Sequence, residues 1–386
     1  MSEKFIQFHR PYITDDEINE VVETVKSGWL SMGPKVLQFE EEFKAIIGCE
    51  NAVSVNSWTA AGHLALEALG IKAGDEVIVP TMTFAATAEI ACYFHAIPVF
   101  VDVEKDTLNI SVSEIEKAIT PKTKAIIPVH YGGQPCDMDE IMDLAKIHNI
   151  KVIEDAAHAL PASYKGKKVG TISDITCFSF YATKTLATGE GGMLCTSDTE
   201  IAERTKLMRM HGMNKDAWKR YTDACSWYYE VVAPGYKYNF TDVQASLGLA
   251  QLRKVEWMRE ERVRIAKIYD EHFKNNEYIE PIVIKTDRET AYHLYPIKVQ
   301  HEKLTINRNR FIEEMKARGV GIGVHFMPVH QHLYYSKTFN LDPKNYPVAE
   351  DAFPRLISIP LYPGLTEEEV YRVIEVIFDI VNTFKK

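Results

Sequence analysis

The chain lacks the features that mark several classes of protein. Its six cysteines are scattered along 386 residues without a CxxC pair, so neither a disulfide framework nor a cysteine metal site is indicated. No apolar run reaches membrane-spanning length, and the first residues lack the apolar stretch of a secretory signal. Net charge is -10 and basic residues form no dense block, so we expect no nucleic acid and no membrane as a partner. These absences predict a cytoplasmic protein.

The sequence has the composition of an ordinary globular chain, 46% hydrophobic and 25% charged. Short β-prone runs alternate with helical patterns, which is typical of a three-layer α/β fold with a mostly parallel sheet. We expect its strands at 51–55, 76–79, 98–101, 125–129, 151–153, 174–180 and 192–196, the last two forming a hairpin near one edge. We predict a large domain with an N-terminal arm at 1–255 and a smaller C-terminal α+β domain at 256–386. A long helix starting near Thr241 should join them, and the smaller domain should contain a strand at 291–298.

One lysine carries the clearest chemical signal. Lys184 lies in the run Ser179-Phe-Tyr-Ala-Thr-Lys184-Thr-Leu-Ala-Thr-Gly-Glu-Gly-Gly192, between two apolar runs, and Glu154-Asp155 ends an earlier one. A lysine among small residues can condense with an aldehyde, and a carboxylate at a strand end can keep a pyridinium nitrogen protonated. This pairing is the chemistry of a pyridoxal 5'-phosphate (PLP) enzyme. The lysine motif alone is weak, because most lysines are solvated surface residues.

The ends of the predicted strands test this hypothesis, because ligands of open α/β sheets lie beyond the carboxyl ends of the strands. Ser57 and Thr59 open a helix, where backbone N–H groups and the helix dipole favour a phosphate. At the other strand ends, Phe84 can stack on the cofactor ring, and Asp155 can meet the pyridine nitrogen. His158 can hydrogen-bond near the phenolic oxygen, and Ser179 can add a further phosphate donor.

Each of these residues also has a structural explanation. Ser57, Thr59 and Asp155 could cap helices, Phe84 and His158 could belong to the core, and Ser179 could be a strand hydroxyl. Separate structural accidents explain poorly why five strand ends supply complementary parts of one cofactor. The sequence therefore favours a PLP site.

Several long stretches resemble the DegT-type nucleotide-sugar aminotransferases, which are fold-type I PLP enzymes. The stretches are Gly33-Pro-Lys-Val-Leu-Gln-Phe-Glu-Glu-Glu-Phe43, Gly74-Asp-Glu-Val-Ile-Val-Pro-Thr-Met-Thr-Phe84, Ile153-Glu-Asp-Ala-Ala-His158, the Lys184 motif, Gly235-Tyr-Lys-Tyr-Asn-Phe-Thr-Asp-Val-Gln-Ala245 and Val324-His-Phe-Met-Pro-Val-His330. They span nearly the whole chain. The resemblance implies the fold-type I architecture and a homodimer whose active sites lie at the subunit interface.

The resemblance also implies roles for single residues. It assigns Lys184 to covalent attachment of PLP, Asp155 to the pyridine nitrogen, and Asn239 to the phosphate in the neighbouring subunit. It gives Phe84, His158 and the three hydroxyl residues the roles already described. Two positions depart from the family pattern: Trp58 stands where glycine or alanine is usual and could narrow the phosphate cradle or point outward, and Tyr181 stands where histidine is common.

A group of histidines, His325, His330 and His332, could suggest a metal site. Its spacing fits no standard zinc pattern and no cysteine or carboxylate completes it, so we expect no metal. The run 319–325 is typical of a strand that enters the active site, so we expect His325 and His330 to contact substrate. The aromatic run Trp227-Tyr-Tyr-Glu230 either packs against the protein or borders the sugar or base pocket.

The resemblance implies a PLP-dependent aminotransferase that converts a nucleotide-linked 4-keto sugar to the 4-amino sugar with L-glutamate as the donor. The polar stretch 214–232 and Gly235-Tyr-Lys-Tyr-Asn239 resemble enzymes that make UDP-linked 4-amino sugars. Amination at position 3 is the alternative, and an amino-acid aminotransferase is another. A PLP-dependent sugar dehydratase is disfavoured because such relatives lack the lysine, and the complete set of catalytic residues disfavours a non-enzymatic regulator.

Overall fold

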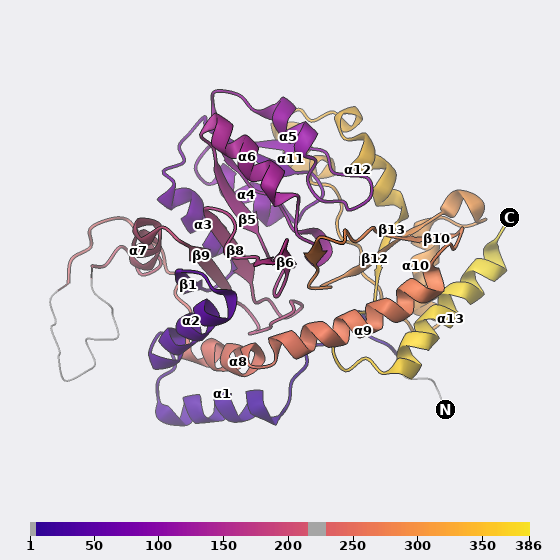
Figure 1. Cartoon of the computed structure of the whole chain (residues 1–386), viewed down its shortest axis with the longest axis horizontal. Coiled ribbons are helices and arrows are strands. Elements are labelled where there is room, and N and C mark those ends of the chain that lie inside the picture. The colour runs from indigo at the N-terminus through magenta and orange to yellow at the C-terminus, as the bar shows by residue number, and fades with distance from the viewer. Residues whose placement is uncertain (1–4, 215–228) are drawn as a thin grey trace.

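The structure is a computed structural model that describes residues 5–214 and 229–386 (Figure 1). The α-helices are α1 (Asp15–Ser27), α2 (Pro34–Ile47), α3 (Trp58–Ala68), α4 (Ala85–Cys92), α5 (Val112–Ala118), α6 (Met138–His148), α7 (Thr199–Met208), α8 (Asp242–Leu252), α9 (Val255–Phe273), α10 (Arg308–Ala317), α11 (Leu333–Thr338), α12 (Pro347–Ala352) and α13 (Glu367–Phe384). The strands are β1 (Asn51–Val55), β2 (Glu76–Pro80), β3 (Ile97–Val101), β4 (Thr123–Ile126), β5 (Lys151–Asp155), β6 (Ser163–Tyr164), β7 (Lys167–Lys168), β8 (Ile175–Ser179), β9 (Gly192–Thr196), β10 (Ile279–Pro281), β11 (Arg288–Glu289), β12 (Tyr295–Val299) and β13 (Leu356–Ile359).

The central sheet has seven strands in the order β1-β9-β8-β5-β4-β2-β3. Only β9 is antiparallel to its neighbours, which are β1 and β8. All other neighbouring pairs are parallel. The mostly parallel sheet and the hairpin near one edge are therefore confirmed. Because six of the strands run in one direction, their carboxyl ends meet at a single edge of the sheet.

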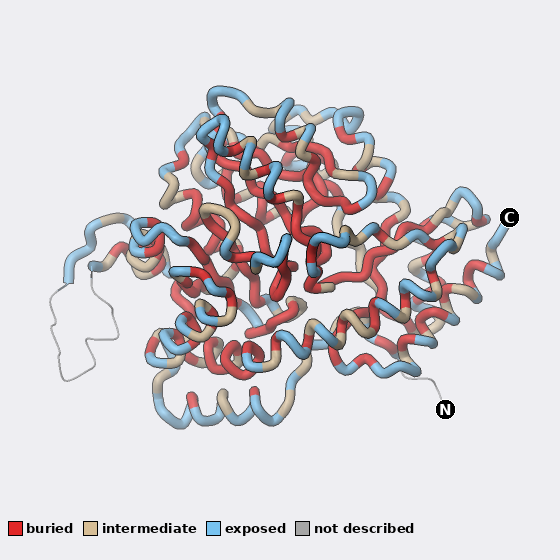
Figure 2. Tube along the Cα trace, in the orientation of Figure 1, coloured by how far each residue is buried: buried red, intermediate tan, exposed pale blue. Residues whose placement is uncertain are grey.

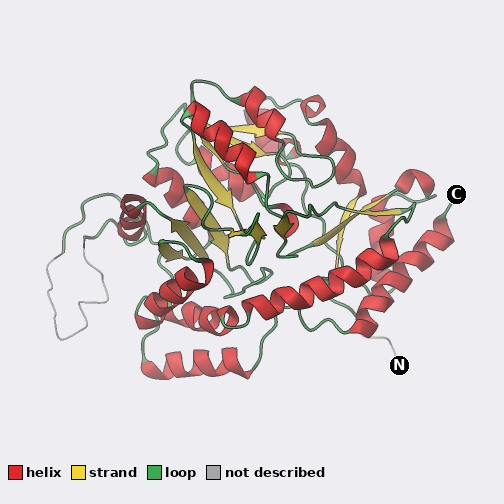
Figure 3. Cartoon of the chain, in the orientation of Figure 1, coloured by secondary structure: helices red, strands yellow, loops and turns green. Residues whose placement is uncertain are grey.

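Helices cover both faces of this sheet, which gives the predicted three layers (Figure 3). On one face, strand residues such as Val79, Ile153 and Leu194 pack with α3 and α4. On the other face, Phe178 packs with α2 and α8, while Ile126 packs with α5 and α6. The strands of this sheet are short and almost entirely buried (Figure 2). Helices shield both faces of the sheet from water, so apolar side chains are buried on both.

A second core belongs to the C-terminal part of the chain. The antiparallel sheet β10-β12-β13 packs with α9, α10 and α13, and Ile6 of the N-terminal segment joins this core. Helix α9 runs along the molecule from the large sheet toward this core (Figure 1). The boundary at residue 256 stays a prediction, and two C-terminal segments cross it: Tyr335 of α11 and Ala349 of α12 pack into the core of the large sheet.

Four predicted elements differ in the structure. The strand expected at 125–129 is β4, which ends at Ile126. The run 319–325, expected to be a strand, makes only isolated bridges, from Val320 to Ile6 and from Gly323 to Ser358. The long helix from Thr241 is two helices, because Lys254 leaves helical geometry between α8 and α9. The strand expected at 291–298 begins only at Tyr295. Residues 291–294 form a loop in which Tyr292 has a φ of 46°, and the N–H groups of Ala291 and Leu294 donate to the carbonyls of Gly133 and Gly132.

Two observations concern a membrane and a metal ion. No helix in the described parts of the chain is long and apolar enough to cross a lipid bilayer. Within residues 5–214 and 229–386, histidine, cysteine and carboxylate side chains form no group of three or more that could hold a metal ion.

Asp242, the first residue of α8, caps a different helix. Its buried carboxylate accepts hydrogen bonds from the N–H groups of Gly33 at 2.7 Å, Lys35 at 3.1 Å and Val36 at 3.1 Å, at the start of α2. Asp242→Ala leaves three buried donors without an acceptor, so we expect it to lower the free energy of unfolding by about 1–3 kcal/mol. Urea denaturation measures the loss. Asp242→Asn keeps one oxygen and should lose less, and an unchanged alanine variant would contradict this capping role.

Candidate active site

A cavity of about 460 Å³ lies at the carboxyl edge of the sheet. It is lined by residues that follow β1, β2, β5 and β8, together with residues from the C-terminal part of the chain. Eight of the ten predicted site residues line it: Ser57, Thr59, Phe84, Asp155, His158, Ser179, Lys184 and His325. The parallel strands thus bring together side chains that are as far apart in sequence as residues 57 and 325.

The hydroxyl end of the cavity lies where β1 turns into α3. Ser57 is the N-cap of this helix, and its Oγ accepts from the N–H of Ala60 at 3.0 Å. Thr59 lies in the first turn, so its hydroxyl and free backbone N–H groups surround the same space. A Cβ at Gly192 would lie 2.5 Å from the carbonyl oxygen of Ser57, so only glycine lets β9 pack against this turn. The arrangement suits an anion.

The structure shows the orientation of Trp58, which the sequence left open. Its side chain is 6% exposed, and the indole N–H donates to the carbonyl of Cys177 at 3.0 Å. The ring is therefore fixed in the core that α3 forms with the sheet, and does not point outward to solvent. Trp58 also lines the cavity at the hydroxyl end.

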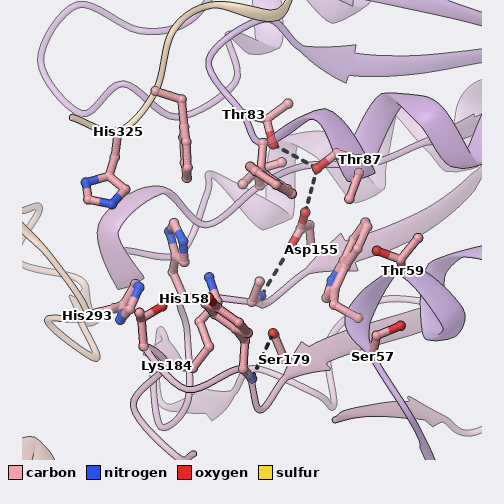
Figure 4. A pocket seen from close by; sticks show the side chains of 18 of the residues that line it. Ser57, Thr59, Thr83, Thr87, Asp155, His158, Ser179, Lys184, His293 and His325 are labelled. Atoms are coloured by element: carbon pink, nitrogen blue, oxygen red, sulfur yellow. Dashed lines mark hydrogen bonds between the residues drawn. The ribbon is translucent and has the colours of Figure 1, made fainter. Parts of the chain in front are cut away.

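Asp155, at the end of β5, is held by two hydrogen bonds. Its Oδ1 accepts from the N–H of Ala157 at 3.1 Å, and its Oδ2 accepts from the hydroxyl of Thr87 at 2.8 Å. Because the Thr87 proton points to the carboxylate, the hydroxyl of Thr83, 2.8 Å away, must donate to Thr87 (Figure 4). Burial raises the pKa of Asp155 to about 6, while these hydrogen bonds and the charge of Lys184 act against the rise.

Lys184 reaches into the cavity between Asp155 and the histidines (Figure 4). Desolvation lowers the pKa of its amine to about 8, although the carboxylate of Asp155 acts in the opposite direction. The unprotonated fraction of the amine near neutral pH is therefore larger than that of an ordinary lysine. An unprotonated amine is the form that attacks a carbonyl and accepts a proton.

Histidines form the opposite end of the cavity. His158 and His293 lie with ring centroids 4.4 Å apart, and His158 also stacks on Phe326 with centroids 5.7 Å apart. His325 donates to or accepts from Ser358 Oγ through Nδ1 at 3.0 Å. Burial holds the pKa of His158 and of His293 well below 6.5, and lowers that of His325 to about 4. All three rings are neutral near pH 7.

The other two predicted site residues do not line this cavity. His330 is fully buried, stacks on Tyr346 with centroids 4.2 Å apart, and lies 2.7 Å from Glu350 through Nε2. These contacts tie the ring to α12 and to Tyr346, away from the cavity, and a contact of His330 with substrate stays a prediction. The side chain of Asn239 donates to the carbonyl of Phe240 at 3.1 Å and is 7% exposed in the single chain. Trp227, the candidate for the base pocket, lies outside the described residues.

The sequence interpretation missed several lining residues. Thr83 and Thr87 are four residues apart at the start of α4, and that spacing beside a strand end was the available signal. His293 and Phe326 come from loops of the C-terminal part. Neither residue follows a predicted strand end, and the pattern around His293 predicts the inside of a strand.

These side chains fit the cofactor that the sequence predicts. PLP needs an amine for its aldehyde, a carboxylate for its ring nitrogen, a ring-stacking surface and an anion cradle. The cavity offers Lys184, the buried carboxylate of Asp155, the ring of Phe84, which is 64% exposed, and the hydroxyl end. His158 Nδ1 is buried without a partner among the described residues, so a ligand could complete its hydrogen bonding.

Comparison with known proteins places the chain among aminotransferases. A profile of the DegT/DnrJ/EryC1/StrS aminotransferase family matches residues 11–378. The spore coat polysaccharide biosynthesis protein SpsC of Bacillus subtilis is 48% identical over 379 residues, which cover 98% of this chain and 97% of SpsC.

Solved structures agree with this match over almost the full length. Spr1654 of Streptococcus pneumoniae, assigned as a sugar aminotransferase and solved in its PMP form, is 36% identical with a TM-score of 0.91, over 98% of this chain and 99% of that chain. The same protein is also known in a PLP form. Helicobacter pylori PseC, an aminotransferase involved in the biosynthesis of pseudoaminic acid, is 31% identical with a TM-score of 0.92, over 99% of this chain and 100% of that chain.

The hydrogen bond from Thr87 should tune Asp155. Thr87→Val keeps the shape of the side chain but removes the donor, so the pKa of Asp155 should rise further by up to about one unit. We expect the acidic limb of the kcat/KM profile against pH to move to higher pH by that amount. Thr87→Ser restores a hydroxyl and should restore the profile. An unshifted valine profile would show that Thr87 acts only in packing.

Proposed function

The chain belongs to the DegT/DnrJ/EryC1/StrS aminotransferase family, and we propose that it aminates position 4 of a UDP-linked keto sugar with L-glutamate as the amino donor. It is a PLP-dependent sugar aminotransferase. The observation that carries the proposal is the cavity that unites Lys184, Asp155 and the hydroxyl end at one edge of the sheet. The residue roles, the sugar and the donor are parts of the proposal.

Each part of the cavity has a task in this reaction. Bound PLP supplies an aldehyde for attachment to an amine and a ring that withdraws electrons from the carbon that loses a proton. Asp155 keeps the ring nitrogen protonated, and its rigid pair of hydrogen bonds fixes the carboxylate for this purpose. Ser57, Thr59 and Ser179 hold the phosphate, while Phe84 covers one face of the ring.

Lys184 serves both as the attachment point and as the proton carrier. With PLP bound, Lys184 would hold it through its amine, and the same amine, once free, would take the proton from the donor's α-carbon. Its lowered pKa, about 8, favours the unprotonated form that this step requires. The same amine returns a proton to the sugar carbon when the keto sugar is aminated, which completes the cycle.

Two kinds of observation support an amino sugar product. SpsC is a spore coat polysaccharide biosynthesis protein and PseC is an aminotransferase involved in the biosynthesis of pseudoaminic acid, and both match this chain over nearly its full length. The choice of position 4 and of UDP rests on the resemblance at Gly235-Tyr-Lys-Tyr-Asn239. All five cysteines in the described regions are free, which suits the cytoplasm in which we place the reaction.

We also propose a homodimer with shared active sites. Asn239 does not line the cavity of its own chain. It forms an isolated β-bridge with Val55, the last residue of β1. Tyr236 and Tyr238 stack on each other with centroids 5.0 Å apart, and also lie outside that cavity. A neighbouring subunit would bring these residues to its partner's cavity, with Asn239 on the phosphate.

A substrate panel tests the function. The enzyme is incubated with L-glutamate and with UDP-, dTDP- and GDP-linked 3-keto and 4-keto sugars, and products are identified by mass spectrometry and NMR. We expect amination of a UDP-linked 4-keto sugar, and no product from Lys184→Ala because it lacks the proton carrier. Amination only at position 3, or sugar dehydration, would contradict the proposed reaction.

Mixing two inactive variants tests the shared site. Lys184→Ala and Asn239→Leu should each be inactive, and an equal mixture should regain about a quarter of the wild-type activity, because half of the dimers hold one intact site of two. Lys184→Ala mixed with Asp155→Asn is the matched control. Lys184 and Asp155 line one cavity of one chain, so no intact site can form there. Equal activity in both mixtures, or none in either, would refute the shared site.

A further inference from the structure

The histidine end of the cavity contains polar atoms that the protein itself leaves unsatisfied. His158 and His293 are 4% and 5% exposed, and the Nδ1 atoms of both rings have no hydrogen-bond partner among the described residues. Leaving a buried polar nitrogen unpaired costs about 1–3 kcal/mol. The two rings face each other beside Lys184 (Figure 4). Such a surface is ready for a ligand that accepts hydrogen bonds.

A buried cation acts electrostatically on this end of the cavity. Arg262 of α9 is 2% exposed and donates to the carbonyl of Met258 at 3.3 Å, and it forms no ion pair with any carboxylate of the described chain. Burial is the largest cause of the lowered pKa of His9 and of His293, and the charge of Arg262 contributes to both, to that of His293 as the last of several causes. An unpaired buried charge is costly, and an entering anion would offset that cost.

The carboxylates that line the cavity lie elsewhere. Asp155, at the end of β5, has both oxygens engaged in hydrogen bonds. Glu190 lies two residues before Gly192, which packs on Ser57. The histidine end therefore has no negative charge of its own among the described lining residues. Its neutral rings can donate N–H groups to an anion, and Lys184 and Arg262 supply a positive field.

We propose that His293, supported by the ring of His158 and by the charge of Arg262, binds the α-carboxylate of the amino donor. The inference rests on the proposed function. The donor's amine must meet the site of Lys184, and its α-carboxylate is one carbon away, so this group must lie beside Lys184. The hydroxyl end is assigned to the phosphate and Asp155 repels anions, which leaves the histidine end.

Binding of glutarate to the PLP-loaded enzyme tests this subsite without chemistry, because glutarate has two carboxylates and no amine. Isothermal calorimetry gives its Kd for the wild type, His293→Leu and His293→Asn. We expect the leucine variant to raise Kd at least about tenfold. The asparagine variant places a polar atom near the Nδ1 position and should lie between the two. Arg262→Gln should raise Kd in the same direction, through loss of charge.

Half-reactions then separate donor from acceptor. With His293→Leu, the KM for glutamate should rise at least about tenfold while the rate with the keto sugar changes by less than about threefold. His148→Asn, at an exposed position in α6, is the matched control and should change neither value. Thermal melting verifies that each variant is folded, and the asparagine variant keeps the test open if the leucine variant is not.

Two outcomes would overturn the inference, and only the second would also contradict the proposed function. If the wild type reacts with glutamate and folded His293 variants bind glutarate as tightly as the wild type, this subsite alone is wrong. If the wild type neither binds glutarate nor reacts with any amino donor, the proposed function fails together with the subsite.

Discussion

The direction of the strands is the constraint on which the rest of the molecule depends. Because β1, β2, β5 and β8 run the same way, their carboxyl ends meet at one edge of the sheet. Each of these strands ends at or shortly before a polar residue that lines the cavity. Ser57, Asp155 and Lys184 share a cavity only for this reason. The antiparallel β9 strengthens the arrangement, since its glycine start packs directly on the Ser57 turn.

Burial then sets the protonation of the site. The same desolvation acts on both kinds of group: it raises the pKa of Asp155 and lowers the pKa of Lys184 and of the histidines. The hydrogen bonds of Ala157 and Thr87 partly restore the carboxylate. The site thus combines a carboxylate held by hydrogen bonds, an amine whose pKa is lowered toward neutrality and neutral imidazoles, an arrangement suited to acid-base chemistry near neutral pH.

The C-terminal part of the chain completes the cavity from the other side. His293 lies in the loop that precedes β12, and His325 and Phe326 lie in the segment that leads toward α11. The N–H groups of Ala291 and Leu294 are anchored to the carbonyls of Gly133 and Gly132, so the loop is tied to the large sheet as well. Large and small parts are therefore coupled at the site itself. Arg262, which acts electrostatically on His293, is a buried residue of helix α9.

The sequence by itself determined the alternation of strands and helices, and it pointed to Lys184 and Asp155 as members of one site. These depend on local patterns: β-prone runs, helix caps and a lysine among small residues. It could not determine the place of His293, the Thr83–Thr87–Asp155 chain of hydrogen bonds or the inward packing of Trp58. It also could not show that His330 is held by Glu350 and Tyr346, away from the cavity that His325 lines. Each of these was decided by tertiary structure, because it depends on which side chain another segment places within hydrogen-bond or packing distance, and spacing along the chain does not carry that information.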